Sequence, residues 1–232
     1  MSYLVKALTT STYPTRVGET PTRNNWTTGK IQEVDAALIN WYADRTDAYT
    51  ILSQSGTTPT GLPSISGLSA VDTCIDGIIH QTVFTLADMA QALPNTGQYV
   101  GTKIFDFPAG RIFVLGVTAS LAEKTTSAIL GTLNGNKTGA LSLGSATASS
   151  TTLNSTMADL LPSTAWASST TINVAGTAVT GALAAAAQFD GTGTAIDMFL
   201  NAAVVTDGDL DADATIAWTG TITVTWINLG DV

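Results

Sequence analysis

The stretch TIAWTGTITVTW at residues 215–226 decides the fold class. Its large apolar side chains share every second position, at Ile216, Trp218, Ile222, Val224 and Trp226. Threonines fill the positions between them, at Thr215, Thr219, Thr221, Thr223 and Thr225. Because successive side chains of a strand point to opposite faces, one face is apolar and the other carries hydroxyls. The pattern predicts a strand of a β-sandwich with one buried and one wetter sheet face, and Gly220 predicts a bulge.

The sequence before this strand contains further strand candidates. Residues 75–85, 103–107 and 111–121 are apolar runs of strand length, and the turn residues Pro108-Ala109-Gly110 separate the last two. We therefore predict a mostly β protein in which residues 61–232 form one β-sandwich domain.

Two segments of this domain depart from simple alternation. Thr85-Leu86-Ala87-Asp88 reads as a capping box and predicts one short helix that ends at Pro94. Residues 125–188 consist largely of Thr, Ser, Ala and Gly with little charge. Their apolar residues still recur at short spacing, so we expect strands and loops with small side chains there.

Residues 1–60 are predicted to be a separate region for attachment or oligomerisation. Residues 1–28 are rich in Thr and have no clear period, which predicts an extended arm. An α-helix is predicted from about Lys30 to Leu52, and residues 53–70 form a turn-rich linker. We place the domain boundary near residue 60.

The predicted helix carries an apolar seam with alternating spacings of three and four residues. Its members are Ile31, Val34, Leu38, Trp41, Arg45, Ala48 and Leu52. The seam suits packing against the protein's own β domain or a neighbour, and it also suits a self-associating bundle. The residues predicted to contact a partner are Trp26, Ile31, Val34, Leu38 and Trp41.

Composition and charge exclude several classes of function. Only 12% of the residues are charged, about half the ~25% usual for soluble domains, which suits large permanent interfaces. The net charge is −9, and all of it lies after residue 60, so an acidic body disfavours nucleic-acid binding. The densest apolar run, at residues 182–187, is too short to span a bilayer, and residues 1–12 lack the apolar core of a secretion signal.

No assembled catalytic motif is present, so we expect a protein that is not an enzyme. Cys74 and His80 are the only thiol and the only imidazole, and they lie in one predicted strand, roughly 20 Å apart at ~3.3 Å per residue. The segment Gly131–Thr138 imitates a P-loop but has Asn136 before its lysine. Gly191-Thr192-Gly193 lacks the third glycine of a dinucleotide fingerprint and predicts a turn.

We expect no cofactor, with Ca²⁺ at one acidic segment as the single candidate. Carboxylates alternate along the sequence at Asp207, Asp209, Asp211 and Asp213. The EF-hand pattern fails there, because Ala212 and Trp218 replace the required Gly and Glu. The segment is either an acidic, solvated hairpin loop or a Ca²⁺-binding loop.

Three segments of residues 71–232 resemble a family of structural proteins from tailed-phage and prophage capsid gene clusters. The first segment is KIFDFPAGRI at 103–112, the second is FDGTGTAIDMFLN at 189–201, and the third is GTITVTWINLGD at 220–231. The resemblance implies a jelly-roll-like fold, no active site and a place in the virion, as a capsid decoration or cement protein. Residues 1–60 lie outside the resemblance.

We therefore expect a cement protein on the capsid exterior, made in the host cytoplasm, that binds the major capsid protein as a homotrimer. It would bind neither nucleic acid nor a membrane. The alternative is a head fibre or tail-associated host-adhesion protein, with the predicted helix as a trimeric stalk. A carbohydrate-cleaving virion enzyme is the third possibility and has no motif in its favour.

Overall fold

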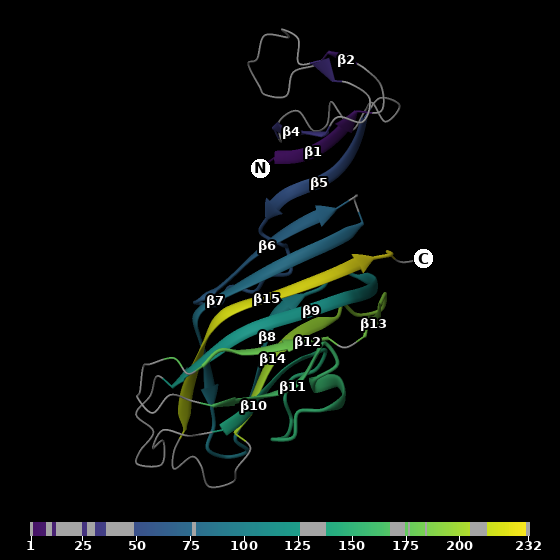
Figure 1. The fold of residues 1–232 in the computed structure, drawn as a ribbon. Coiled ribbons are helices and arrows are strands. Elements are labelled where there is room, and N and C mark those ends of the chain that lie inside the picture. The colour runs from purple at the N-terminus through teal and green to yellow at the C-terminus, as the bar shows by residue number, and fades with distance from the viewer. Residues whose placement is uncertain are drawn as a thin grey trace. The chain divides into compact units, whose positions relative to one another are not determined.

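The computed structural model describes residues 2–7, 11–12, 25–26, 31–35, 49–75, 78–125, 138–167, 175, 177–183, 185–204 and 213–230. The chain divides into two compact units (Figure 1). Unit 1 comprises Met1–Thr58 and Val71–Gln81, and unit 2 comprises Pro59–Ala70 and Thr82–Val232. The strands β6 (Leu68–Ile75) and β7 (Ile79–Leu93) contribute residues to both units.

Unit 2 is built from two antiparallel sheets. The first sheet has the order β7, β15 (Ala214–Asn228), β9 (Gly110–Thr125) and β12 (Val179–Ala182), and β13 (Ala187–Gly191) also pairs with β9. The second sheet has the order β8 (Tyr99–Asp106), β14 (Asp197–Val204), β10 (Thr138–Gly144) and β11 (Leu161–Ala167). A short 3₁₀ turn, η2 (Ser155–Met157), follows β10.

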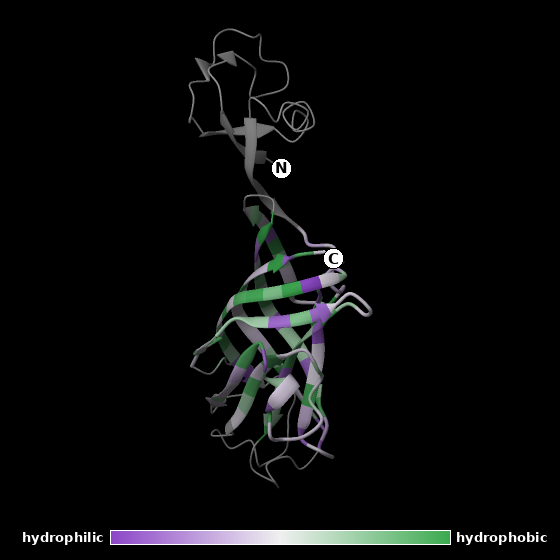
Figure 2. Cartoon of the chain, turned by 90° about the vertical axis from the view of Figure 1, so that its right-hand side faces the viewer, coloured by the Kyte–Doolittle hydropathy of each residue, from purple (hydrophilic) through white to green (hydrophobic). Residues whose placement is uncertain are grey.

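The core of unit 2 lies between these two sheets. Apolar and polar residues alternate along its strands (Figure 2), and the buried members from both sheets form one hydrophobic cluster. Edge-to-face aromatic contacts tie the sheets together: Phe84–Phe105 at 5.4 Å between ring centroids and Trp166–Trp218 at 5.9 Å. The mostly β fold and the β-sandwich predicted from the sequence are confirmed.

The strand predicted at residues 215–226 is confirmed as part of β15, and its five large apolar side chains are buried. The bulge predicted at Gly220 is wrong, because the register with β9 runs without interruption from Thr219 to Thr221 and shifts only between Thr225 and Trp226. Gly220 faces inward at φ 140°, and a Cβ there would collide with the carbonyl oxygen of Ser120. The glycine allows two backbones to approach closely.

The short helix predicted after Thr85 is also wrong, since β7 runs through to Leu93. The strand has inward positions at Leu86, Met89, Gln91 and Leu93, so the alternation is displaced once, between Leu86 and Met89. Two consecutive exposed residues, Ala87 and Asp88, cause this, and Asp88 has a left-handed φ of 57°. One extra residue shifts the phase of an alternating strand, as in a β-bulge.

Unit 1 contains a small antiparallel sheet with the order β6, β5 (Tyr49–Thr57), β1 (Ser2–Ala7) and β4 (Ile31–Asp35). Two further short strands, β2 (Ser11–Thr12) and β3 (Asn25–Trp26), pair with each other.

The α-helix predicted from about Lys30 to Leu52 is wrong at both ends, which are the strands β4 and β5. Residues 36–48 lie outside the described residues. Both strands pair with β1, so residues 2–7 have two neighbours and do not form an extended arm. Long-range pairing overrides local helical periodicity here, and the β-forming residues of β1 favour that pairing.

Candidate interaction surface

The outward face of β12, β9 and β15 carries an open depression of about 500 Å³. Five of its eight lining residues bear hydroxyls, Thr118, Ser120, Thr180, Thr221 and Thr223, and the others are Ala119, Gly181 and Ala182. The side chains are small, and β12 lies directly beside β9 at this point. The depression offers hydrogen-bond donors and acceptors but no carboxylate, imidazole or thiol among its lining residues.

The strand register arranges these hydroxyls in a row across three strands. Ser120 of β9 lies opposite Thr180 of β12 on one side and Thr221 of β15 on the other. Thr118 lies opposite Thr223 in the same way. The threonines of β15 face outward because alternation directs the large apolar residues of this strand into the core.

An ion pair closes one end of this face. Lys124 Nζ of β9 lies 2.6 Å from Asp88 Oδ2 of β7, and Thr219 donates a hydrogen bond to Asp88 Oδ1 at 2.9 Å. The hydrogen bond from Lys124, followed by that from Thr219, holds the pKa of Asp88 below its usual value. Three strands are thereby linked across the bulge of β7.

A second carboxylate lies near the other end of β9. Hydrogen bonds from Thr192 lower the pKa of Asp190, and the charge of Arg111 lowers it further. Thr192 donates from its backbone N at 3.2 Å and from its hydroxyl at 2.7 Å. The turn predicted at Gly191-Thr192-Gly193 is confirmed, because Asp190 closes it at the end of β13.

The interior of the sandwich contains polar side chains that bond to the fold itself. Trp218 Nε1 donates to Gln91 Oε1 at 2.6 Å, and Gln91 Nε2 donates to Thr102 Oγ1 at 2.8 Å and to the carbonyl of Leu200 at 2.9 Å. These bonds connect the first sheet to the second. Gln91 is a structural bridge whose hydrogen-bonding groups are engaged.

A second buried amide, Asn201, holds the loop after β10. Its Nδ2 donates to the carbonyls of Ala146 and Met157 at 2.9 Å each, and its Oδ1 accepts from Ala148 N at 2.8 Å. Ser142 also donates to the Met157 carbonyl, at 2.6 Å. The residues of this network support one another and give it a structural role.

The three segments that carry the family resemblance meet at one end of the sandwich. Gly110 of the first segment lies opposite Gly191 of the second in the pairing of β9 with β13. Phe107 N donates to the carbonyl of Ile196 at 2.9 Å, which joins the same two segments again. Residues separated by more than 80 positions in the sequence therefore form one structural unit.

The third segment contacts the first through Asn228. Its Nδ2 donates to the carbonyl of Ala109 at 3.1 Å, and its Oδ1 accepts from Gly230 N at 2.8 Å. Gly110 has a φ of 123°, and a Cβ there would lie 2.5 Å from Asn228 Oδ1. Close packing and a positive φ together explain the glycine at position 110.

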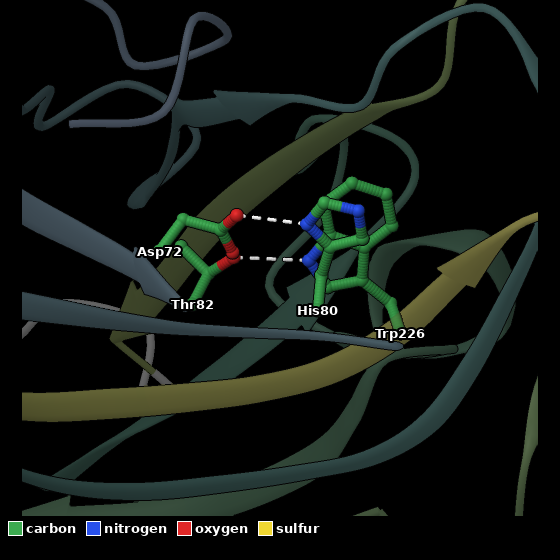
Figure 3. A network of polar contacts seen from close by, with 4 residues as sticks. All are labelled: Asp72, His80, Thr82 and Trp226. Carbon is green, nitrogen blue, oxygen red and sulfur yellow. Dashed lines mark hydrogen bonds and ion pairs between the residues drawn. The ribbon is translucent and has the colours of Figure 1, made fainter. Parts of the chain in front are cut away.

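Two polar pairs are drawn in Figure 3, each within its own unit. In unit 1, His80 Nδ1 and Asp72 Oδ2 lie 2.8 Å apart and link β6 to β7. In unit 2, Trp226 Nε1 donates to Thr82 Oγ1 at 2.9 Å and links β15 to β7. A carboxylate beside a histidine is the orienting half of a hydrolase triad, but a triad also needs a nucleophile, and the sequence has no nucleophile elbow.

The sequence-based placement of Cys74 and His80 in one strand is wrong. Cys74 lies in β6, which ends at Ile75, and His80 lies in β7, which begins at Ile79. The separation of roughly 20 Å inferred from a single regular strand therefore does not apply. Sequence reasoning also missed Asp72 as the partner of His80, because that pairing depends on the register of two strands.

The predicted partner-contact residues lie in or near unit 1. Trp26 is in β3, and Ile31 and Val34 are in β4; only their backbone positions are described. Leu38 and Trp41 lie outside the described residues. Because β4 is a strand, Ile31 and Val34 do not belong to the helical seam predicted for them.

The candidate Ca²⁺ loop is described only at its last carboxylate. Asp207, Asp209 and Asp211 lie outside the described residues, whereas Asp213 is exposed and its Oδ1 accepts a hydrogen bond from Asn95 N at 2.9 Å. Within the ranges that the structure covers, no group of three His, Cys, Asp or Glu side chains is placed to hold a metal ion.

In the same ranges, no helix has the length and apolarity needed to cross a bilayer.

Comparison with known proteins identifies no family. No protein-family profile and no curated protein matches the chain. A chain of the infectious bursal disease virus Gt strain structure aligns with a TM-score of 0.34 and 13% identity over 97% of this chain and 51% of that one. A chain of the Gx strain gives 0.33 and 14%, covering 98% and 52%.

A chain of the cyanophage Pam1 capsid asymmetric unit aligns with a TM-score of 0.28 and 15% identity, over 74% of this chain and 92% of that one. The present chain spans about half the length of the infectious bursal disease virus chains that it matches. These TM-scores are too low to establish a shared fold.

Proposed function

We propose that the sandwich of unit 2 is a jelly roll. Its eight main strands, numbered 1 to 8 in chain order, are β7, β8, β9, β10, β11, β12, β14 and β15. In this numbering the two sheets have the orders 1-8-3-6 and 2-7-4-5. That is the strand order of the double Greek-key sandwich that recurs in viral capsid and lectin domains. The strand order is the observation on which the proposal depends most.

We further propose that the chain is a structural protein of a tailed-phage virion, a decoration or cement protein that binds the major capsid protein. The resemblance of the three segments favours this role, and their convergence around Gly110 makes them one unit rather than three scattered matches. A fold alone does not assign a function, so the combination of topology and segments supports the proposal.

The chemistry of the described residues favours a role without catalysis. The large buried amides bond to backbone and side chains of the sandwich. The open depression on the first sheet presents hydroxyls and lacks a general acid or base among its lining residues. Because the chain has few charged residues, covering its surface with a capsid neighbour would carry only a small desolvation cost.

Reconstitution with capsids tests this function. Capsids assembled without the chain are mixed with the purified full chain, and bound protein is quantified after sedimentation together with the temperature at which the capsids open. A cement protein binds in hundreds of copies per capsid and raises the opening temperature. Absence of binding, or binding that leaves capsid stability unchanged, contradicts the proposal. Light scattering of the free chain tests the proposed homotrimer separately.

A head fibre or host-adhesion protein is the second candidate, and the jelly-roll order itself favours it, because lectin domains share this architecture. Copy number in the virion separates the two roles, since a fibre is present in far fewer copies than a cement protein. Binding of the isolated chain to host-surface saccharides would favour adhesion, and its absence at high saccharide concentration would favour cement.

A further inference from the structure

Residues 145–160 connect β10 to β11, and we call them the covering loop because they lie on the outward face of the second sheet. Ala148 and Leu153 of the loop form a small apolar cluster with Ala140 of β10 and Ala203 of β14. Both sheet residues alternate with residues of the main core, so they point away from it. The loop is therefore held on the sheet by contacts of its own.

Met157 joins the covering loop to the second sheet and also ties the loop to itself. Its carbonyl accepts hydrogen bonds from Ser142 Oγ of β10 at 2.6 Å and from Asn201 Nδ2 of β14 at 2.9 Å. Its thioether Sδ accepts from Ser149 N at 3.3 Å and from Ser149 Oγ at 3.5 Å. A thioether is a weak acceptor, so the sulfur is the weaker of these two attachments.

The sulfur of Met157 is also the most accessible among the methionines that the structure describes. Met157 is 9% exposed, whereas Met89 and Met198 are 0% exposed in the main core. Ser149, which donates to the sulfur, is itself exposed. A small reagent at the surface therefore lies close to this thioether, while close packing excludes it from the other two.

We propose that Met157 is an oxidation site through which peroxides release the covering loop from the second sheet, an inference independent of the proposed capsid role. The oxidant is a small hydroperoxide from solution. A sulfur lone pair attacks one peroxide oxygen, the S–O bond forms as the O–O bond breaks, and the other oxygen takes up the proton and leaves as water or alcohol. The thioether is oxidised to the sulfoxide and the peroxide is reduced.

The space around the sulfur explains why oxidation moves the loop. An N–H···O hydrogen bond alone spans about 2.9 Å between nitrogen and oxygen. Ser149 N lies only 3.3 Å from Met157 Sδ, so an oxygen bonded to the sulfur on that side has no room unless Ser149 moves away. In other directions the oxygen meets the packed surroundings of a largely buried side chain. The sulfoxide is also more polar than the thioether, which makes its burial less favourable.

Peptide mass spectrometry of the full chain after timed exposure to hydrogen peroxide tests the site. A Cys74→Ser background removes oxidation of the thiol. We expect Met157 to be oxidised about tenfold or more faster than Met89 and Met198, because access limits the reaction in the folded chain. The three rates should converge when the chain is unfolded in urea before exposure. Oxidation of Met157 no faster than that of the core methionines in the folded chain overturns the proposal.

Hydrogen exchange of the oxidised chain tests the release of the loop. Peptides from residues 145–160 should exchange about tenfold or more faster after oxidation, since a released loop loses its protection. The amide of Ala148 is a specific reporter, because it donates to Asn201 Oδ1 at 2.8 Å in the closed loop. Peptides from β15 should be unaffected. Unchanged exchange of the loop in a chain oxidised at Met157 contradicts the release.

Two matched variants assign the effect to one sulfur. Met157→Leu removes the thioether with little change in volume, and Met198→Leu does the same in the main core. After peroxide, loop exchange should stay unchanged in Met157→Leu and should rise in Met198→Leu as in the parent chain. A loop that opens with peroxide in Met157→Leu overturns the assignment. The site and exchange measurements on the Cys74→Ser chain decide the proposal even if Met157→Leu opens the loop by itself.

Discussion

The indole of Trp218 donates a hydrogen bond of 2.6 Å to Gln91 Oε1 in the interior of the sandwich. Both side chains are almost completely buried, and the amide of Gln91 continues the connection to Thr102 and Leu200 in the other sheet. A polar bridge of this kind fixes the relative position of two packed sheets, because removal of one member leaves buried groups without partners.

Gln91→Leu removes this bridge with little change in side-chain volume. We expect the free energy of unfolding to fall by about 2–3 kcal/mol, since the Trp218 N–H and the groups in the second sheet lose a buried partner. Urea denaturation followed by tryptophan fluorescence measures the change. Gln188→Leu, at an exposed position of β13, is the control and should stay within about 0.5 kcal/mol of the wild type. Equal effects would contradict the role of Gln91.

The two packed indoles Trp166 and Trp218 provide a paired test. Among the residues that the structure describes, Trp166 Nε1 is buried and has no hydrogen-bond partner, whereas Trp218 Nε1 is bonded to Gln91. Phenylalanine at either position removes similar volume, but Trp218→Phe also leaves Gln91 Oε1 unsatisfied. We expect Trp218→Phe to destabilise the protein by about 1–2 kcal/mol more than Trp166→Phe in urea denaturation. A larger effect at Trp166 would refute this assignment.

Sequence periodicity predicted the sandwich where alternation is uninterrupted and failed where one residue is inserted. In β15, the inward positions from Ile216 to Trp226 keep a strict period of two. In β7, the extra residue at Ala87–Asp88 changes the phase of the alternation, and the capping-box motif at Thr85–Asp88 wrongly predicted a helix at that interruption. A bulge depends on the pairing of the strand with its neighbours, which one segment of sequence does not specify.

Residues of unit 1 were assigned incorrectly for a related reason. The strands β4 and β5 pair with β1, and the paired residues are 25 or more positions apart in the sequence. Contacts over such separations are invisible to a local pattern. The row of hydroxyls on the candidate interaction surface was only partly predictable. The threonines of β15 predict a hydroxyl-bearing face, but only the register places Ser120 and Thr180 beside Thr221.

Gly110 is the residue most constrained by the convergence of the three segments. Gly110→Ala introduces a Cβ at a φ of 123° and 2.5 Å from Asn228 Oδ1. We expect a loss of about 2–3 kcal/mol in unfolding free energy, because a strained backbone and a steric conflict add. Gly193→Ala is the control, since its Cβ would meet no atom within 4 Å. Thermal denaturation measures the two variants, and coinciding unfolding curves would contradict the proposed constraint at Gly110.

The ion pair between Asp88 and Lys124 predicts a specific acid sensitivity. Asp88 has a pKa below its usual value of 3.8 in the folded protein, chiefly because of the hydrogen bond from Lys124 and also because of that from Thr219. A carboxyl with a lowered folded pKa stabilises the protein above its unfolded pKa, and this stabilisation disappears as the pH falls through the folded value. Asp88→Asn removes the titration, so the variant should lose less stability than the wild type between neutral pH and the acid limb below 3.8. Urea midpoints measured across this range check the expectation. Because Asp88 is exposed, salt should reduce the difference in stability between the two proteins. Parallel pH profiles of the wild type and Asp88→Asn at low salt would show that the Asp88–Lys124 ion pair does not contribute to stability.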